Sequence, residues 1–156
     1  MKIIFLDFDG VLNSIQYDRV RTENEGNIDE TRMPLLKRIV DETGAVIVLS
    51  TSWRKHWEAE DEKLDEIGRW INETFDKFGM SIFDKTPLIS ASDRALEVRT
   101  WLGEHGDNAS SFVILDDIAL GWGELADNLV KTDYRMGRGL EEGHVTRAIE
   151  ILGAKD

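Results

Sequence analysis

The first apolar segment of this 156-residue chain ends in two carboxylates that are one residue apart, Asp7 and Asp9. Alternate side chains of an extended strand point to the same side, so both carboxylates face the same way. Gly10 follows them and allows a sharp turn with close approach to a ligand. Adjacent carboxylates repel unless a cation or a shared proton relieves them, and a hard cation such as Mg²⁺ takes oxygen ligands. The pattern therefore indicates a divalent-metal site, with a simple acidic turn as the alternative.

Two further apolar segments also end in residues that can do chemistry. Residues 45–49 are followed by Ser50, and residues 112–115 are followed by the acidic pair Asp116 and Asp117. Apolar segments alternate with helical patterns, which predicts an α/β fold with a doubly wound, Rossmann-like parallel sheet and helices on both faces. Ligands bind outside the carboxyl ends of such strands, near the point where strand order reverses. We therefore expect these residues to meet in one site.

The apolar spacing also predicts the elements that position these residues. Five parallel strands are expected, and Gly44 is the expected stop of the first long helix. We expect helices between residues 30 and 44, over 64–78, from near 93 to 102, and over 145–152. The strands are expected around 3–6, 45–49, 88–89, 112–115 and 129–130.

Two other patterns fit surface positions better than chemistry. The acidic run over residues 58–66 lacks the ligand alternation and the glycine of a calcium loop, so we expect a solvated helix face there. The three histidines, His56, His105 and His144, are too scattered for a catalytic triad or a zinc site.

Composition limits the classes of function. A hydrophobic content of 41% supports one globular domain over residues 1–156. The chain has no cysteine, which excludes disulfides and thiolate chemistry and fits a cytoplasmic location. No apolar run approaches about 18 residues, so no membrane span is expected. The net charge of −12 disfavours unspecific coating of nucleic acid but leaves a small local site open.

The polar strand ends together resemble the motifs of the haloacid dehalogenase-like (HAD) superfamily. Residues 7–11, with the sequence DFDGV, are similar to its motif I, residues 45–50 to motif II, and residues 112–117 to motif IV. Arg94 stands where the superfamily places the Lys or Arg of motif III, with Arg99 as the alternative. The chain resembles most the capless branch found beside nucleic-acid repair enzymes, including the phosphatase domains of polynucleotide kinase-phosphatases.

The resemblance implies how the acids act. Asp7 is the expected nucleophile, which forms an aspartyl-phosphate, and Asp9 is the expected general acid and then general base. Mg²⁺ is the expected cofactor. The resemblance implies that it is held by the Asp7 carboxylate, the Asp9 backbone carbonyl and Asp117, with Asp116 acting mainly through bound water.

The resemblance also implies contacts to the phosphate and to the rest of the substrate. Ser50 would donate a hydrogen bond to a phosphate oxygen, and Thr51 or Ser52 could fill the same place. Arg94 would neutralise phosphate charge and keep the nucleophile ionised. Gly10 would let the backbone approach the substrate. Trp53 and Arg54, directly after the motif II strand, would lie at the mouth of the site and could stack on a base or pack against the scaffold.

The gaps between the motifs bear on the size of the substrate. Residues 12–44 and 55–93, where the superfamily inserts caps, leave no room for a separate cap domain. An open site suits a large phosphorylated substrate such as a nucleic-acid end, or a small nucleotide or sugar phosphate with a lid supplied by oligomerisation. Basic residues after strand ends could form a positive rim, or they could be scattered surface charges. They are Arg19, Arg21, Arg54, Lys55, Arg135 and Arg138.

A Mg²⁺-dependent phosphomonoester hydrolase is thus the leading interpretation. A receiver-type phosphoacceptor module also combines acids, Mg²⁺ and a hydroxyl residue on a doubly wound sheet. Its acidic pair ends the first strand, whereas here the adjacent pair ends a late strand. A catalytically inactive binding domain is a third alternative, which the presence of every expected acid disfavours.

Overall fold

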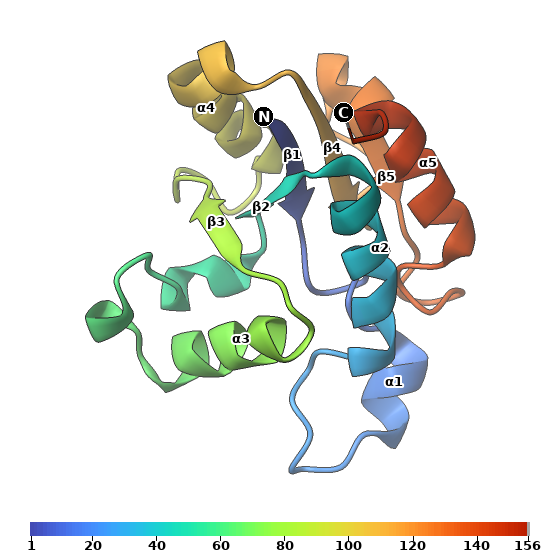
Figure 1. Ribbon diagram of the computed structural model, residues 1–156. Coiled ribbons are helices and arrows are strands. Elements are labelled where there is room, and N and C mark those ends of the chain that lie inside the picture. The colour runs from blue at the N-terminus through green and yellow to red at the C-terminus, as the bar shows by residue number, and fades with distance from the viewer. Residues whose placement is uncertain (156) are drawn as a thin grey trace.

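A five-stranded parallel sheet forms the centre of the fold in the computed structural model, which describes residues 1–155. The strand order is β3-β2-β1-β4-β5, so the chain builds outward from β1 on one side and then crosses to the other (Figure 1). The strand order therefore reverses beside β1, between β1 and β4. This confirms the expected α/β class and sheet. The strands are β1 (Lys2–Leu6), β2 (Val46–Leu49), β3 (Ile82–Lys85), β4 (Ser111–Asp116) and β5 (Leu129–Lys131).

Alternation along β1 divides the core into two layers. Ile4 and Leu6 face a cluster that includes α2 (Met33–Thr43), α3 (Glu66–Lys77) and α5 (Glu142–Leu152). Ile3 and Phe5 face the opposite way, toward α4 (Arg94–His105), where Trp101 packs edge-on against Phe5. Figure 1 shows α2 and α5 side by side on one face of the sheet. Helices thus cover both faces, as the sequence predicts.

Local signals fix where the helices begin and end. Gly44 closes α2 in the left-handed conformation, with φ of 72°, as expected of a helix stop. Asp93 opens α4, because its side chain accepts a hydrogen bond from Leu96 N at 2.9 Å. Ser14 caps the short helix α1 (Ile15–Val20) in the same manner. Within the described residues there are also five 3-10 turns: η1 (Glu30–Arg32), η2 (Ser52–His56), η3 (Asp61–Lys63), η4 (Gly106–Asn108) and η5 (Gly123–Asn128).

The third strand differs from its predicted position. It runs over Ile82–Lys85, and the side chains of Leu88 and Ile89 are exposed in the loop that follows. The sequence IFDK does not reveal this strand, because it lacks an apolar run. Asp84 faces α4 instead, where its Oδ2 accepts a hydrogen bond from Trp101 Nε1 at 2.8 Å. Because Asp84 is polar and its hydrogen-bond partner lies far along the sequence, this strand shows no apolar pattern that sequence reasoning could detect.

The acidic run over residues 58–66 is also not the predicted helix face. It consists of loop and the single turn η3, and α3 begins only at Glu66. Asp65 explains the late start, because its Oδ1 accepts a hydrogen bond from Gly68 N at 2.8 Å and so caps the helix. Within residues 1–155, none of the helices has the length and apolar character needed to cross a membrane.

Candidate active site

Asp7, Asp116 and Asp117 meet at the carboxyl ends of β1 and β4. The register pairs Leu6 with Leu115, and Asp7 N donates a hydrogen bond to Leu115 O at 3.0 Å. One carboxylate oxygen from each of the three aspartates lies within 4.8 Å of the others. Three acids at this spacing offer the oxygen ligands that a hard divalent cation takes. The side chain of Asp9, the fourth residue expected at the metal, is not part of this cluster.

Gly10 makes the close approach of Asp117 possible. Its φ is +84°, a conformation that side chains disfavour, and a Cβ on this residue would lie 2.3 Å from Asp117 Oδ2. The buried Thr132, directly after β5, holds the same turn, because its hydroxyl donates to Gly10 O at 2.5 Å. Thr132 is not among the residues predicted from the sequence, where its one signal is its position after a strand.

Arg94 lies between two of the acids. Its Nη1 is 2.9 Å from Asp7 Oδ2 and 2.8 Å from Asp116 Oδ2. Burial acts to lower the pKa of Arg94, but Asp7 and Asp116 together raise it above its ordinary value. Arg99, the alternative for this role, faces away and lies 3.6 Å from Glu124. The structure therefore brings Arg94, and not Arg99, to the acids.

The surroundings of Asp7 favour its protonated form in the metal-free protein. Burial raises the pKa of Asp7 to about 7, and the negative charges of Asp116 and Asp117 add to the shift. Arg94 and a hydrogen bond from Phe8 N at 2.9 Å act in the opposite direction without cancelling it. Burial and Asp116 also raise the pKa of Asp117. A cation bound between these carboxylates would favour the ionised forms of both.

Asp9 is held from both sides by neighbouring side chains. Trp53 Nε1 donates to its Oδ2 at 3.1 Å, and Asn13 Nδ2 donates to its Oδ1 at 2.9 Å. Asn13 also accepts a hydrogen bond from Gly10 N at 2.8 Å, so one residue fixes both the turn and the carboxylate. From the sequence, Trp53 is expected at the mouth of the site, but its hydrogen bond to Asp9 is not. Asn13, a polar residue four positions after Asp9, is not predicted at all.

Ser50 and Thr51 differ in how their hydroxyls are used. Ser50 follows β2 and its N donates to Leu6 O at 3.0 Å, which sets it beside Asp7. The Ser50 hydroxyl is buried and has no hydrogen-bond partner within residues 1–155. Thr51 Oγ1 accepts a hydrogen bond from Trp53 N at 3.3 Å and so begins η2. An unpaired buried hydroxyl is costly, and an incoming phosphate oxygen at Ser50 would satisfy it.

Arg54 is buried rather than open at the mouth. Its Nε donates to Thr86 O at 3.0 Å, and its Nη1 donates to Thr51 O at 2.8 Å and Ser50 O at 3.2 Å. Its Nη2 lies 2.7 Å from Glu97 Oε2. All three guanidinium nitrogens thus contact the protein, so of the two alternatives for Arg54 the structure shows packing against the scaffold and not an exposed surface for a base.

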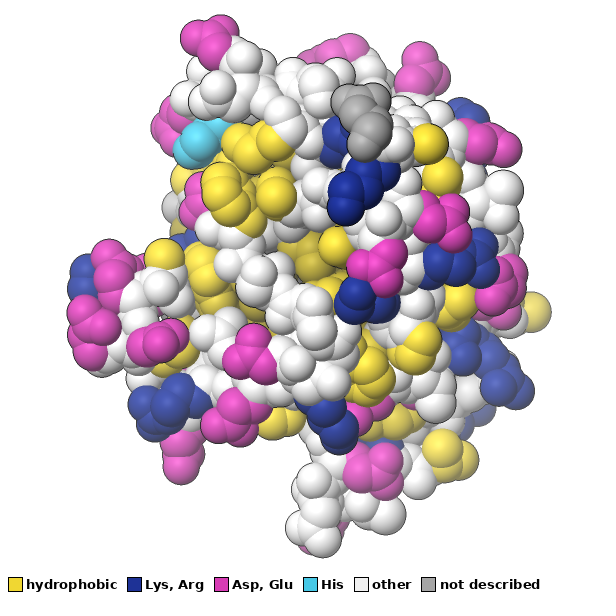
Figure 2. Space-filling model, in the orientation of Figure 1, with side chains coloured by type: hydrophobic (Ala, Val, Ile, Leu, Met, Phe, Trp, Pro, Cys, Tyr) yellow, Lys and Arg dark blue, Asp and Glu magenta, His cyan; other side chains and the backbone are white. Residues whose placement is uncertain are grey.

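The remaining candidates for a positive rim divide into two groups. Arg21 lies 3.4 Å from Asp18, so its charge is partly compensated. The others are exposed and, within the described part of the chain, have no carboxylate within 4.0 Å: Arg19, Lys55, Arg135 and Arg138. All four lie on segments that follow carboxyl ends of strands. Figure 2 shows Lys and Arg side chains at its lower right, beside α1 and the loop that leads to α5.

Comparison with protein families gave a match that spans most of the chain. A family model described as the HAD domain in Swiss Army Knife RNA repair proteins matches residues 3–145, which includes every candidate site residue. Comparisons with curated proteins and with solved structures gave no match.

Proposed function

This chain belongs to the family of HAD domains in Swiss Army Knife RNA repair proteins, and we propose that it is a Mg²⁺-dependent phosphomonoester hydrolase. The observation that carries the proposal is the placement of Arg94, 2.9 Å from Asp7 and 2.8 Å from Asp116, among three aspartates with oxygens within 4.8 Å of one another. Such a site pairs a carboxylate nucleophile with the positive charge that a phosphate dianion needs.

The carboxylates of Asp7 and Asp117 and the backbone carbonyl of Asp9 would hold the metal. Asp116 is already engaged, because its Oδ2 accepts from Arg94 at 2.8 Å and its Oδ1 accepts from Ile118 N at 2.9 Å. We therefore assign Asp116 a contact through water. Bound Mg²⁺ would reduce the repulsion between the Asp7 carboxylate and the phosphate dianion.

The side chains then divide the reaction into two steps. In the first, an Asp7 oxygen bonds to phosphorus, the bond to the leaving oxygen breaks, and Asp9 gives that oxygen a proton. In the second, Asp9 takes a proton from water, the water oxygen attacks phosphorus, and the bond to Asp7 breaks to release phosphate. Trp53 and Asn13 orient Asp9 for both transfers. Ser50 and Arg94 bind phosphate oxygens.

We further propose that the substrate is a phosphorylated nucleic-acid end. The family that matches this chain is named for RNA repair proteins. Four exposed cations lie on segments that follow the carboxyl ends of strands, and the net charge of −12 is otherwise unfavourable for a polyanion. A capless site would admit the end of a chain, whereas a small nucleotide or sugar phosphate would need a lid from another subunit.

Phosphate release from a panel of phosphorylated sugars, nucleotides and oligonucleotide ends tests the activity. We expect hydrolysis to require Mg²⁺ and to stop in EDTA. Asp7→Asn should abolish turnover, since an amide is a poor nucleophile, and Asp9→Asn should lower it by at least ~10²-fold. Asp61→Asn, at an exposed acid in η3, is the matched control and should be fully active. Undiminished turnover by Asp7→Asn would rule out the mechanism.

A further inference from the structure

A shallow cavity that is widely open to solvent, with a volume of about 400 Å³, lies between α3 and the loop that follows α1, outside the cluster of proposed catalytic acids. Figure 1 shows this loop and α3 as neighbouring segments at the carboxyl end of the sheet. Of the residues that line this cavity, the proposed mechanism uses Trp53. Its apolar lining is Trp53, Ile67 and Trp70, and its polar lining includes Arg21, Asn24 and Asn27. We call it the tryptophan cavity.

Two residues that line the tryptophan cavity are linked by hydrogen bonds to Asp9, the proposed general acid. Trp53 donates its indole N–H to Asp9 Oδ2 at 3.1 Å. On a second side, Asn27 O accepts a hydrogen bond from Asn13 Nδ2 at 2.8 Å, and the same Nδ2 donates to Asp9 Oδ1 at 2.9 Å. Asp9 must face the leaving oxygen in order to protonate it. The part of the substrate that is attached to the leaving oxygen therefore begins close to the cavity, next to the Trp53 side chain.

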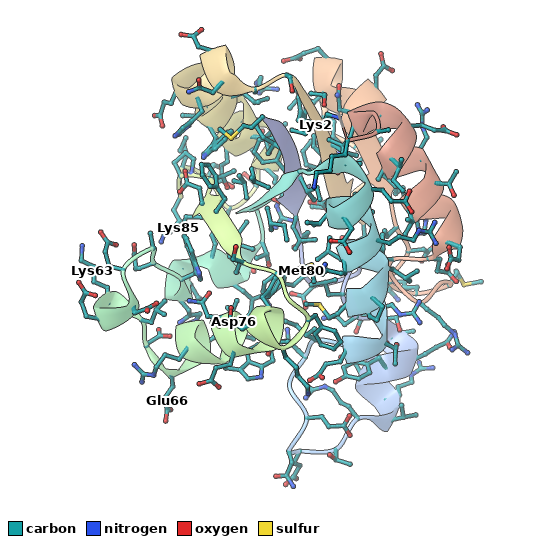
Figure 3. The ribbon with its side chains drawn as sticks, in the orientation of Figure 1. Lys2, Lys63, Glu66, Asp76, Met80 and Lys85 are labelled. Atoms are coloured by element: carbon teal, nitrogen blue, oxygen red, sulfur yellow. The ribbon has the colours of Figure 1, made fainter. Side chains whose placement is uncertain are left out.

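The chemistry of the tryptophan cavity fits a flat, uncharged ring with polar edges. Two indoles and Ile67 supply stacking surface. The carboxylates of Glu23, Glu25 and Glu66 also line the cavity and outnumber the one cation there, Arg21, which is paired with Asp18. Figure 3 labels Glu66 at the start of α3. A second phosphate would be repelled, whereas ring N–H and amino groups would find acceptors.

The tryptophan cavity is also held in shape before any ligand enters. A Cβ on Gly26 would lie 2.1 Å from Trp70 Cζ2, so the loop meets the six-membered ring of this indole at a distance that only glycine allows. Tyr17 fixes the loop, because its hydroxyl contacts Gly26 O at 2.7 Å and Ile28 O at 3.0 Å. A prearranged stacking surface costs little ordering on binding.

We propose that the tryptophan cavity receives the nucleobase of the nucleotide whose phosphate is removed. This rests on the proposed phosphatase function and names the part of the substrate that is recognised. The base stacks against Trp53 and Trp70, the sugar lies beside Asp9, and the phosphate lies at Asp7. Because the cavity is acidic, the backbone of a longer strand leaves it after this one nucleotide.

Binding to the catalytically blocked Asp7→Asn protein with Mg²⁺ tests the proposal. The probes are a nucleoside 5′-monophosphate, a nucleoside 3′-monophosphate and ribose 5-phosphate, which lacks the base, and calorimetry gives each Kd. Adding Trp70→Ala should weaken binding of at least one nucleotide by roughly tenfold or more, the loss expected for one base–aromatic stack. Ribose 5-phosphate should change less than about twofold, because its contacts lie outside the cavity.

Two further variants keep the test decisive if Trp70→Ala lowers stability. Asn24→Trp introduces a bulky side chain at an exposed loop position that lines the cavity, and it should cause the same selective loss by filling the space. Phe83→Ala removes an exposed aromatic ring on β3, outside the cavity, and should change neither ligand. Unchanged nucleotide binding in Asn24→Trp, or equal losses for both ligand classes, would overturn the proposal. Hydrolysis of ribose 5-phosphate by the wild-type protein tests the phosphatase function separately.

Discussion

Arg54 and Glu97 form a buried ion pair, with Arg54 Nη2 2.7 Å from Glu97 Oε2. The pair joins the two segments that carry the proposed phosphate contacts. Arg54 donates to Ser50 O at 3.2 Å, and Glu97 lies one helical turn after Arg94 on α4. Glu97 Oε2 also accepts a hydrogen bond from Ile89 N at 2.8 Å, which ties down the loop after β3. The buried charge pair thus contributes to the relative position of Ser50 and Arg94.

Removing one partner of this pair should be costly. Glu97→Ala leaves the Arg54 guanidinium buried without its counter-charge, and we expect a loss of roughly 3–5 kcal/mol in the free energy of unfolding. Urea unfolding measures this loss. The matched control is Glu124→Ala, which removes the more exposed partner of Arg99 from a 3.6 Å pair and should cost no more than about 1 kcal/mol. Similar losses in both variants would contradict a structural role for the buried pair.

The raised pKa of Asp7 predicts how stability depends on pH. The pKa of Asp7 is about 7 in the folded, metal-free protein, mainly because of burial, against 3.8 as its ordinary value. Between these values the folded state holds a proton that the unfolded state has released. The resulting stabilisation is complete below about pH 4 and is lost as the pH rises through 7. In EDTA, the wild-type protein should therefore lose stability relative to Asp7→Asn over this range, as thermal unfolding can show.

Mg²⁺ should reverse this trend, because it competes with the proton for the same carboxylates. The rise in Tm on adding Mg²⁺ should be small at pH 5.5 and larger at pH 8. Asp7→Asn, which lacks the titrating group, provides the comparison. An equal Mg²⁺-induced rise at both pH values would show that the metal does not bind where Asp7 titrates.

The site was predictable from sequence where its residues directly follow buried strands. Asp7, Ser50 and Asp116 each end an apolar run, and parallel strands bring such ends together. Two residues that act through side-chain hydrogen bonds, Asn13 and Thr132, were not predicted, although Thr132 directly follows β5. Asn13 acts on Asp9 through a turn, and Thr132 reaches Gly10 across 122 positions of sequence.

The same limit explains why the sequence misplaces β3 and does not decide between the two alternatives for Arg54. The position of β3 depends on Asp84, a polar residue whose partner, Trp101, is 17 positions away. The burial of Arg54 depends on Glu97 and on carbonyls of the loop after β3, none of which a local pattern reveals. Apolar periodicity predicts which elements form, but it does not predict which polar groups they bury together.

The four exposed cations on segments that follow strand ends predict a dependence on salt that distinguishes large from small substrates. If Arg19, Lys55, Arg135 and Arg138 contact the phosphates of an oligonucleotide, its binding releases counterions. The kcat/KM for a phosphorylated oligonucleotide should then fall steeply between about 50 and about 200 mM salt. Hydrolysis of a small sugar phosphate should change much less. Steady-state kinetics over a salt series measures both.

Variants at the loop after β5 identify the residues behind this effect. The double variant Arg135→Ala, Arg138→Ala should lower kcat/KM for the oligonucleotide and reduce the salt slope by about one unit for each phosphate that an arginine no longer neutralises. Its activity on the sugar phosphate should be unchanged. Lys63→Ala is the control, because Lys63 is an exposed cation on η3, labelled in Figure 3. Equal salt sensitivity for both substrates would remove the nucleic-acid end as the substrate and leave the proposed phosphatase chemistry of Asp7 and Asp9 untouched, because that chemistry does not depend on these exposed cations.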